Sequence, residues 1–144
     1  MIDKERIKSK IKTVKQEREY LKDFEGISFQ KFLNSENIHQ YYGAVHHLQV
    51  AVQAVLDIAQ HIASYQRFKS YTSNKEVFEI LKDNNVITFD IATSMTNAVG
   101  LRNVIVHQYE EVDPEKVYDI IQNHLDDIDV FILEIDKYIS LKSK

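Results

Sequence analysis

Hydrophobic residues recur every three or four positions along most of the chain, and no segment alternates apolar and polar residues as a strand would. Only three Gly and one Pro interrupt this pattern, so we expect few breaks and long helices. The expected fold class is all-α: an antiparallel bundle of four main helices plus short connecting helices, in a single domain over residues 1–144. The main helices are expected over residues 3–24, 36–68, 88 to about 109, and 113–140, with short ones over 29–33 and 75–84.

Residues with capping side chains mark the expected helix starts. Ser28, Asn74 and Thr88 each precede an expected helix, and their side-chain oxygens can accept a hydrogen bond from the first turn. Asp113 followed by Pro114 is a clearer start, because Pro is favoured at the first helical position.

The helices over 3–24 and 36–68 differ in how much of their surface is apolar. The first has one apolar seam, which consists of Ile7, Ile11, Val14, Arg18 and Leu21. The second is apolar on nearly all sides and keeps only a narrow polar stripe of His46, Gln49, Gln53, Asp57, Gln60 and Ser64. A helix apolar on most sides must be covered on most sides. Because one small bundle covers only one face well, we expect a second subunit and hence a symmetric homodimer.

Composition limits the compartment and the partners. Hydrophobic residues make up 44% of the chain, enough for one buried core, and the absence of Cys suits a cytoplasmic protein. The charged start at Met1–Arg6 is unlike a signal peptide, and no apolar run approaches the roughly 18 residues of a membrane span, so no membrane association is expected.

The net charge of −4 conceals an asymmetry. Residues 3–22 carry eight Lys or Arg against four Asp or Glu, whereas residues 110–136 carry ten acidic residues against one Lys. Charged faces of this kind are usually solvated surface. Any polyanion contact should therefore avoid the C-terminal helix.

The segment 101–109, near the end of the apolar helix after Thr88, holds the candidate chemistry: Arg102, Asn103, His107 and Tyr109. Arg presents a planar fork of donors suited to phosphate, and His exchanges a proton near neutral pH. Both could instead cap the last carbonyls of the helix.

Arg102 and Tyr109 fall in line with the apolar seam of this helix. An Arg buried in such a seam needs a partner or a water-filled cleft. Asp57 or Gln53 could support it, Asp57 through an internal ion pair.

His107 is out of line with Arg102. It follows Arg102 by five residues and so points about 140° away on an ideal helix. Either the helix unwinds near Val106, or a two-fold mate shares the site and places two Arg102 and two His107 around one cleft.

The order Arg102-Asn103, three further residues, His107, one residue, Tyr109 resembles the signature of the HEPN superfamily and, more narrowly, of its HepT-like toxins. The stretches 44–62, 77–81 and 109–113 resemble that family too, so the likeness covers nearly the whole chain. Family members often carry an acidic residue on the second helix where this chain has Gln53.

The resemblance implies a metal-independent RNA endonuclease, the toxin of a type VII-like toxin–antitoxin system, with its cleft between two protomers. The expected roles are catalytic: Arg102 as phosphate clamp, His107 as acid and base, and Asn103 as an orienting residue. Tyr109 is the candidate site at which a cognate minimal nucleotidyltransferase antitoxin attaches AMP, or else an ordinary tyrosine at the helix edge. No cofactor is expected.

Other functions have less support in the sequence. The alternative to the nuclease is a non-catalytic helical subunit that partners a minimal nucleotidyltransferase and binds its nucleotide or substrate. Asp57 and His61 have helical i,i+4 spacing, but a metal site built from His46, His47, Asp57 and His61 is disfavoured, because the chain has no H-E-x-x-H motif and no paired Glu-x-x-His. His39 and His124 give no site signal, and no Gly-rich phosphate loop exists.

Overall fold

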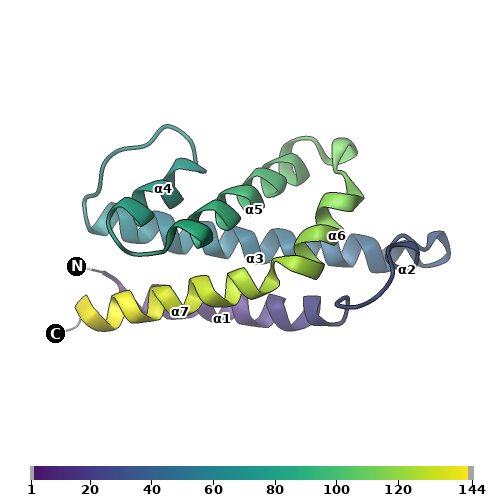
Figure 1. Ribbon diagram of the computed structural model, residues 1–144, viewed down its shortest axis with the longest axis horizontal. Helices are drawn as coiled ribbons and strands as arrows, with labels where there is room; N and C mark the ends of the chain where they lie inside the picture. The colour runs from purple at the N-terminus through teal and green to yellow at the C-terminus, as the bar shows by residue number, and fades with distance from the viewer. Residues whose placement is uncertain (1, 143–144) are drawn as a thin grey trace.

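The computed structural model describes residues 2–142, apart from the side chain of Ser35, and confirms the all-α class over that range. Figure 1 shows α1, α3 and α7 extending along the length of the molecule, with α5 running obliquely above α3. The α-helices are α1 (Lys4–Lys22), α2 (Phe29–Phe32), α3 (Ile38–Tyr65), α4 (Glu76–Asp83), α5 (Phe89–His107), α6 (Pro114–Asn123) and α7 (Leu125–Lys142), with 3₁₀ turns at Ser35–Asn37 and Tyr109–Glu111.

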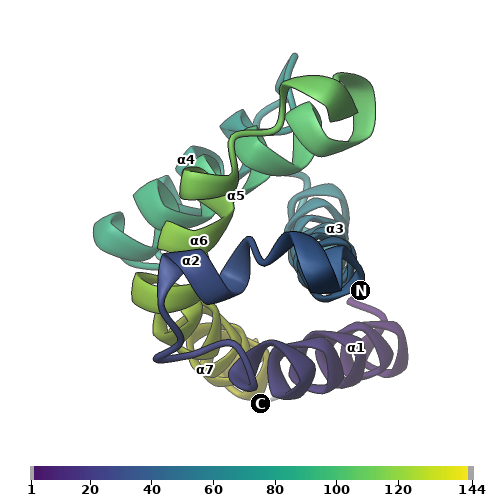
Figure 2. The same cartoon turned by 90° about the vertical axis from the view of Figure 1, so that its right-hand side faces the viewer.

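The helices surround one apolar core, to which α1, α3, α4, α5, α6 and α7 all contribute buried side chains. Viewed from the end of the molecule, α1, α3, α5 and α7 lie around a common centre (Figure 2). No helix within residues 2–142 is both long and apolar enough to cross a membrane.

The apolar surface of α3 is covered within one chain. Among the apolar residues of α3 from Tyr42 to Ile62, only Tyr42 and Val50 escape burial, and Ala51, Ala54 and Ile58 are at most 3% exposed. Close packing of α1 on one side and of α4 and α5 on another produces this burial. The described part of this helix therefore shows no surplus apolar surface and gives no support to the homodimer, which stays a prediction.

The expected helix over 113–140 is two helices, and this is a second correction. His124 leaves the helical region, with φ −129° and ψ 4°, so α6 ends before it and α7 begins after it. Two hydrogen bonds hold this break: His124 Nδ1 lies 3.0 Å from Asp127 Oδ2, and the Ser94 hydroxyl donates to the same oxygen at 2.7 Å. Figure 1 shows α6 descending from the end of α5 to meet α7.

The capping predictions had mixed outcomes. Ser28 and Asp113 cap α2 and α6 with their side chains, as expected. Thr88 occupies the N-cap position of α5, but its hydroxyl bonds Glu134 of α7 instead of the helix. Asn74 is not the cap of α4, because its side-chain oxygen accepts a hydrogen bond from Gln60 at 3.0 Å and the helix starts one residue later, after Lys75.

Arg18, expected in the apolar seam of α1, joins that helix to α7. Its guanidinium lies 3.1 Å from Glu25, 3.5 Å from Asp126 and 3.2 Å from Asp129. The Arg18 side chain is only 16% exposed, so protein carboxylates stabilise its charge more than water does.

Candidate active site

Arg102 projects from the seam of α5 that faces the core. Its neighbours on this seam, Met95, Ala98 and Ile105, are buried, and Arg102 itself is half-buried. One guanidinium nitrogen, Nη1, donates to Asn103 Oδ1 at 2.9 Å. The Nε atom is buried and has no hydrogen-bond partner among the described residues. Burying a guanidinium N–H without an acceptor costs free energy, so this side chain is suited to bind an anion.

The expected pairing of Arg102 with Asp57 or Gln53 is not found. One carboxylate oxygen of Asp57 accepts from Lys10 of α1 at 3.0 Å, and the other accepts from Gln53 at 2.8 Å. Asp57 and Gln53 both line a shallow groove between α1 and α3. The hydrogen bonds of Asp57 go to Lys10 and Gln53 in that groove, so neither Asp57 nor Gln53 supports Arg102 by direct contact.

His107 ends α5 and is exposed. The helix does not unwind near Val106, since α5 is continuous through His107 and the N–H of Gln108 still bonds Val104 O at 2.8 Å. On one continuous helix, Arg102 and His107 point about 140° apart. The two side chains of one chain therefore diverge. The unwound helix is wrong, and the site shared by two chains stays a prediction.

Tyr109 lies outside α5, which corrects the expectation that it shares a helical face with Arg102. Gln108 has φ −140° and ψ 50°, and Tyr109 begins the 3₁₀ turn that follows. The Tyr109 ring is 50% exposed. It stacks on Tyr42 of α3 with ring centroids 6.1 Å apart and planes 29° apart. Its position is thus set by contact with α3.

The raised pKa values of Tyr41 and Tyr109 favour the protonated phenol at both residues. Burial, followed by the neighbouring Tyr109, Tyr42 and Asp113, raises the pKa of Tyr41 to about 12. Burial and then Tyr42 raise the pKa of Tyr109 as well. At neutral pH Tyr109 is a neutral phenol, so its use as a nucleophile requires a base from elsewhere.

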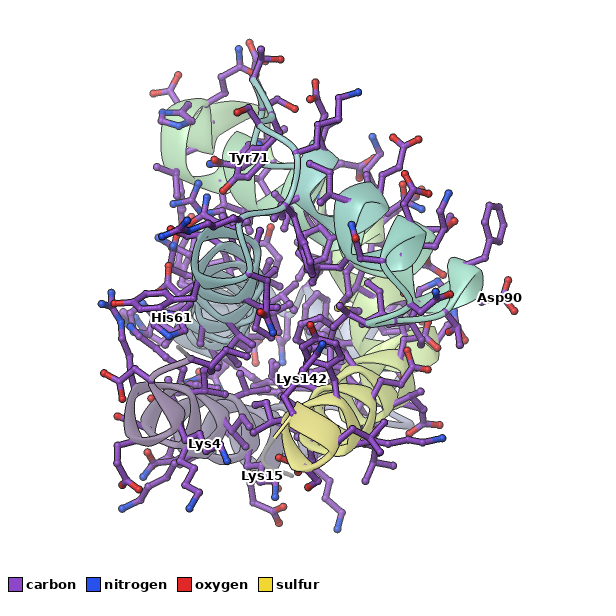
Figure 3. The ribbon with its side chains drawn as sticks, turned by 90° about the vertical axis from the view of Figure 1, so that its left-hand side faces the viewer. Lys4, Lys15, His61, Tyr71, Asp90 and Lys142 are labelled. Atoms are coloured by element: carbon purple, nitrogen blue, oxygen red, sulfur yellow. The ribbon has the colours of Figure 1, made fainter. Side chains whose placement is uncertain are left out.

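The histidines considered for a metal site have separate partners. His47 Nδ1 lies 2.6 Å from Glu17 Oε2, and Nε2 of His61 accepts the backbone N–H of Asp3 at 3.2 Å. Figure 3 shows His61 on α3 above the end of α1 that carries Lys4. Within residues 2–142 no group of three or more His, Asp or Glu side chains is placed to hold a metal ion.

Sequence reasoning missed a cleft of about 490 Å³ between α5 and α6. Its lining includes Ser94, Lys116 and His124 but neither Arg102 nor His107. Sequence reasoning also missed Tyr42 as a neighbour of the signature. The signal for Tyr42 was its position one helical turn before His46, in line with the polar stripe of α3.

Comparison with known proteins extends the likeness over most of the chain. The family model described as Ribonuclease HepT-like matches residues 14–135. An mRNA nuclease HepT of Shewanella oneidensis is 38% identical over 85 residues, which span 59% of this chain and 64% of that protein. A tRNA nuclease HepT of Aphanizomenon flos-aquae is 32% identical over 134 residues, 92% of this chain and 89% of that protein.

Solved structures agree. The tri-AMPylated HEPN toxin of Shewanella oneidensis, solved in complex with MNT antitoxin, superposes with a TM-score of 0.81 at 31% identity, covering 95% of this chain and 99% of that one. These matches confirm the resemblance stated from the signature and, with it, the expectation of an RNA nuclease. The chain belongs to the HepT-like ribonuclease family.

Proposed function

We propose that the protein is a metal-independent RNA endonuclease and the cytoplasmic toxin of a type VII-like toxin–antitoxin pair. The observation that carries the proposal is Arg102, a half-buried guanidinium that bonds Asn103 and has a buried, unsatisfied Nε within the described chain. A bound RNA phosphate would supply the missing acceptor once the half-buried Arg102 side chain turns Nε toward it. The names of the relatives, an mRNA nuclease and a tRNA nuclease, support RNA as the substrate.

The proposed reaction is a transesterification at phosphorus. The ribose 2′-oxygen loses its proton to His107 and attacks the adjacent phosphorus, while the bond from phosphorus to the 5′-oxygen breaks. A second imidazolium protonates the departing 5′-oxygen, which leaves a 2′,3′-cyclic phosphate and a 5′-hydroxyl. Arg102 stabilises the charge that develops on the phosphorane, and Asn103 acts as a positioning residue that holds the guanidinium.

A symmetric homodimer would complete this site. Arg102 and His107 of one chain point apart on a continuous helix. His107 of the partner subunit could approach Arg102 across a two-fold axis, and the two imidazoles would divide the roles of base and acid. Val106, an apolar residue 40% exposed beside His107, supports an interface at this end of α5.

Tyr109 is the proposed site of regulation by a minimal nucleotidyltransferase antitoxin. Its ring is half-exposed and so accessible to an enzyme. The phenol oxygen would attack the α-phosphate of ATP, pyrophosphate would leave, and the partner would supply the base that takes the phenol proton, because the raised pKa keeps Tyr109 neutral. The attached AMP would bring bulk and negative charge to an anion-binding cleft and so oppose RNA binding.

The nuclease is tested by cleavage of total RNA in excess EDTA by wild-type protein and His107→Ala, with analysis of the product ends. We expect cyclic-phosphate ends from the wild type and a loss of about 10²-fold or more in the variant. His39→Ala, which removes another exposed histidine, is the matched control and should cleave normally. Equal cleavage by wild type and His107→Ala would contradict the catalytic role. An unmodified Tyr109 should first be verified by mass spectrometry, since AMP would silence the enzyme.

The shared site is tested by mixing subunits. Arg102→Ala and His107→Ala should each be inactive alone. If the site takes Arg102 from one chain and His107 from the other, co-expression should restore a measurable share of cleavage. Each mixed dimer keeps one Arg102 facing one His107 and lacks only the second imidazole, whereas the His107→Ala dimer lacks both. Complete inactivity of verified mixed dimers would contradict the shared site. If neither variant loses activity, the non-catalytic binding subunit becomes the better account.

A further inference from the structure

A row of aromatic and imidazole rings crosses the surface from the signature to α1. We call it the ring row, and its members in order are Tyr109, Tyr42, His46, His47 and Tyr20. Tyr109 stacks on Tyr42, and His46 follows Tyr42 by one helical turn on the same face of α3. The centroids of His46 and His47 are 5.9 Å apart, and those of His47 and Tyr20 are 4.7 Å apart.

The ring row is accessible. Tyr109, Tyr42 and Tyr20 are 50%, 45% and 48% exposed, and His46 is exposed as well. A single exposed tyrosine is ordinary. Here the exposed rings form a row across three elements, with ring contacts between Tyr109 and Tyr42 and from His46 through His47 to Tyr20, and with one turn of α3 between these two groups.

The rings are also held in place. His47 is fixed by its 2.6 Å contact with Glu17, and the side chains of these two residues are 28% and 15% exposed. Tyr42 lies between Tyr41, whose centroid is 5.4 Å away, and Tyr109. Rings that are already fixed lose little conformational entropy when a ligand stacks on them.

We propose that the ring row binds single-stranded RNA by base stacking and leads the strand to the cleavage site. This inference rests on the proposed nuclease function and adds the route of its substrate. Every base has a π-face, so an aromatic row tolerates many sequences. The row begins at Tyr109, two residues after His107, so a strand that follows it passes next to the residues proposed for catalysis.

The position of the ring row lessens the conflict between an acidic chain and an anionic substrate. Single-strand sites usually combine stacking rings with a basic groove. The net charge is −4, but the row ends at Tyr20 on α1, where residues 3–22 carry eight Lys or Arg against four Asp or Glu. Glu17, an acidic group in contact with the row, pairs with His47. An AMP attached to Tyr109 would place an adenine on this same row, so modification would compete directly with the strand.

The test is the affinity of wild-type protein and its variants for a labelled single-stranded RNA whose 2′-hydroxyls are methylated, so that it binds without being cleaved. We expect Tyr42→Ala and Tyr20→Ala each to weaken binding about fivefold or more, the usual effect of losing one stacked base. Tyr42→Phe should bind as the wild type, because a phenyl ring stacks equally well.

Tyr65→Ala is the matched control. Tyr65 lies on the same helix, is 47% exposed and packs against a histidine, His61, with ring centroids 4.4 Å apart, but it sits at the opposite end of α3 from the signature. Its loss should leave RNA affinity unchanged. Circular dichroism of each variant verifies that the helices are intact.

Equal affinities for Tyr42→Ala and Tyr65→Ala would overturn the ring row as an RNA site, while wild-type cleavage measured on the same preparation would leave the nuclease standing. Loss of affinity for a minimal nucleotidyltransferase without loss of RNA affinity would also overturn it and would make the row a protein-binding surface. A wild type that neither binds nor cleaves RNA would overturn the row and the nuclease together.

Discussion

Arg18 and Arg102 both interrupt a seam of buried apolar side chains, but their guanidinium groups have different surroundings. Arg18 meets three carboxylates, Glu25, Asp126 and Asp129, at 3.1 to 3.5 Å. Arg102 meets the amide oxygen of Asn103 and keeps a buried Nε without an acceptor in the described chain. The carboxylates around Arg18 satisfy its charge, so that side chain stabilises the fold. The guanidinium of Arg102 keeps one N–H without an acceptor among the described residues, so it is available to a ligand.

The largest expected difference between the two arginines is catalytic. Arg102→Gln should reduce RNA cleavage by about 10²- to 10³-fold, the usual loss when one donor to a charged transition state is removed. Arg18→Gln should cleave at nearly the wild-type rate. Initial rates of cleavage of one labelled RNA at saturating enzyme concentration compare the two variants. Full activity of Arg102→Gln would contradict the catalytic difference between the two arginines.

The second difference is in stability, and it has the opposite order. Arg18→Gln breaks the link between α1 and α7 and should lower the free energy of unfolding by about 1–2 kcal/mol, less than for a fully buried pair because Asp126 and Asp129 are exposed. Arg102→Gln should change it by no more than about 0.5 kcal/mol. Urea unfolding followed by circular dichroism compares the two, and the reverse ranking would make Arg102 the structural residue.

The apolar periodicity was sufficient to predict the helices that bury Ile7, Leu48 or Met95, because the burial of such residues depends mainly on their own spacing. The acidic partners of Arg18 on α7 lie more than a hundred positions away and only the folded arrangement brings them together. The break at His124 also involves a residue distant in sequence, because Ser94 of α5 donates to Asp127, the carboxylate that His124 contacts.

The candidate site was predictable only in its composition. The signature supplied Arg102, Asn103, His107 and Tyr109, because a resemblance carries residue types and order. The resemblance did not predict in which direction these side chains point. Tyr109 leaves the helix at Gln108 and rests on Tyr42, a contact between segments far apart in sequence that periodicity does not reveal.

A smaller effect concerns a buried histidine remote from the signature. Burial, and then the nearby charge of Arg6, lowers the pKa of His61 below its usual 6.5, and the neutral ring accepts the N–H of Asp3. The unfolded chain binds this proton more readily, so stability present above pH 6.5 should be lost as the pH falls through and below that value.

Urea midpoints measured at about pH 7.5 and about pH 5.5 test the titration of His61. His61→Gln keeps an acceptor for the Asp3 N–H but cannot titrate, so its midpoint should fall less on acidification than that of the wild type. An equal fall in both proteins would show that other groups carry the pH dependence.

A small effect on stability is expected for a substitution at Asp57, a residue that does not contact Arg102. Asp57→Asn weakens the contact with Lys10, whose side chain is 37% exposed, and should cost about 0.5 kcal/mol of stability. RNA cleavage should be unchanged, because the partners of Asp57 are Lys10 and Gln53. A large loss of cleavage in a folded Asp57→Asn protein would return Asp57 to the site.

The central claim, that the guanidinium of Arg102 is kept for an RNA phosphate, is tested most directly by the salt dependence of RNA binding. Wild-type protein and Arg102→Gln should be titrated with the methylated single strand at several salt concentrations. We expect weaker binding by the variant and a plot of log affinity against log salt that is shallower by about 0.7, the contribution of one phosphate contact to a single strand. An unchanged affinity and an unchanged slope would contradict the claim.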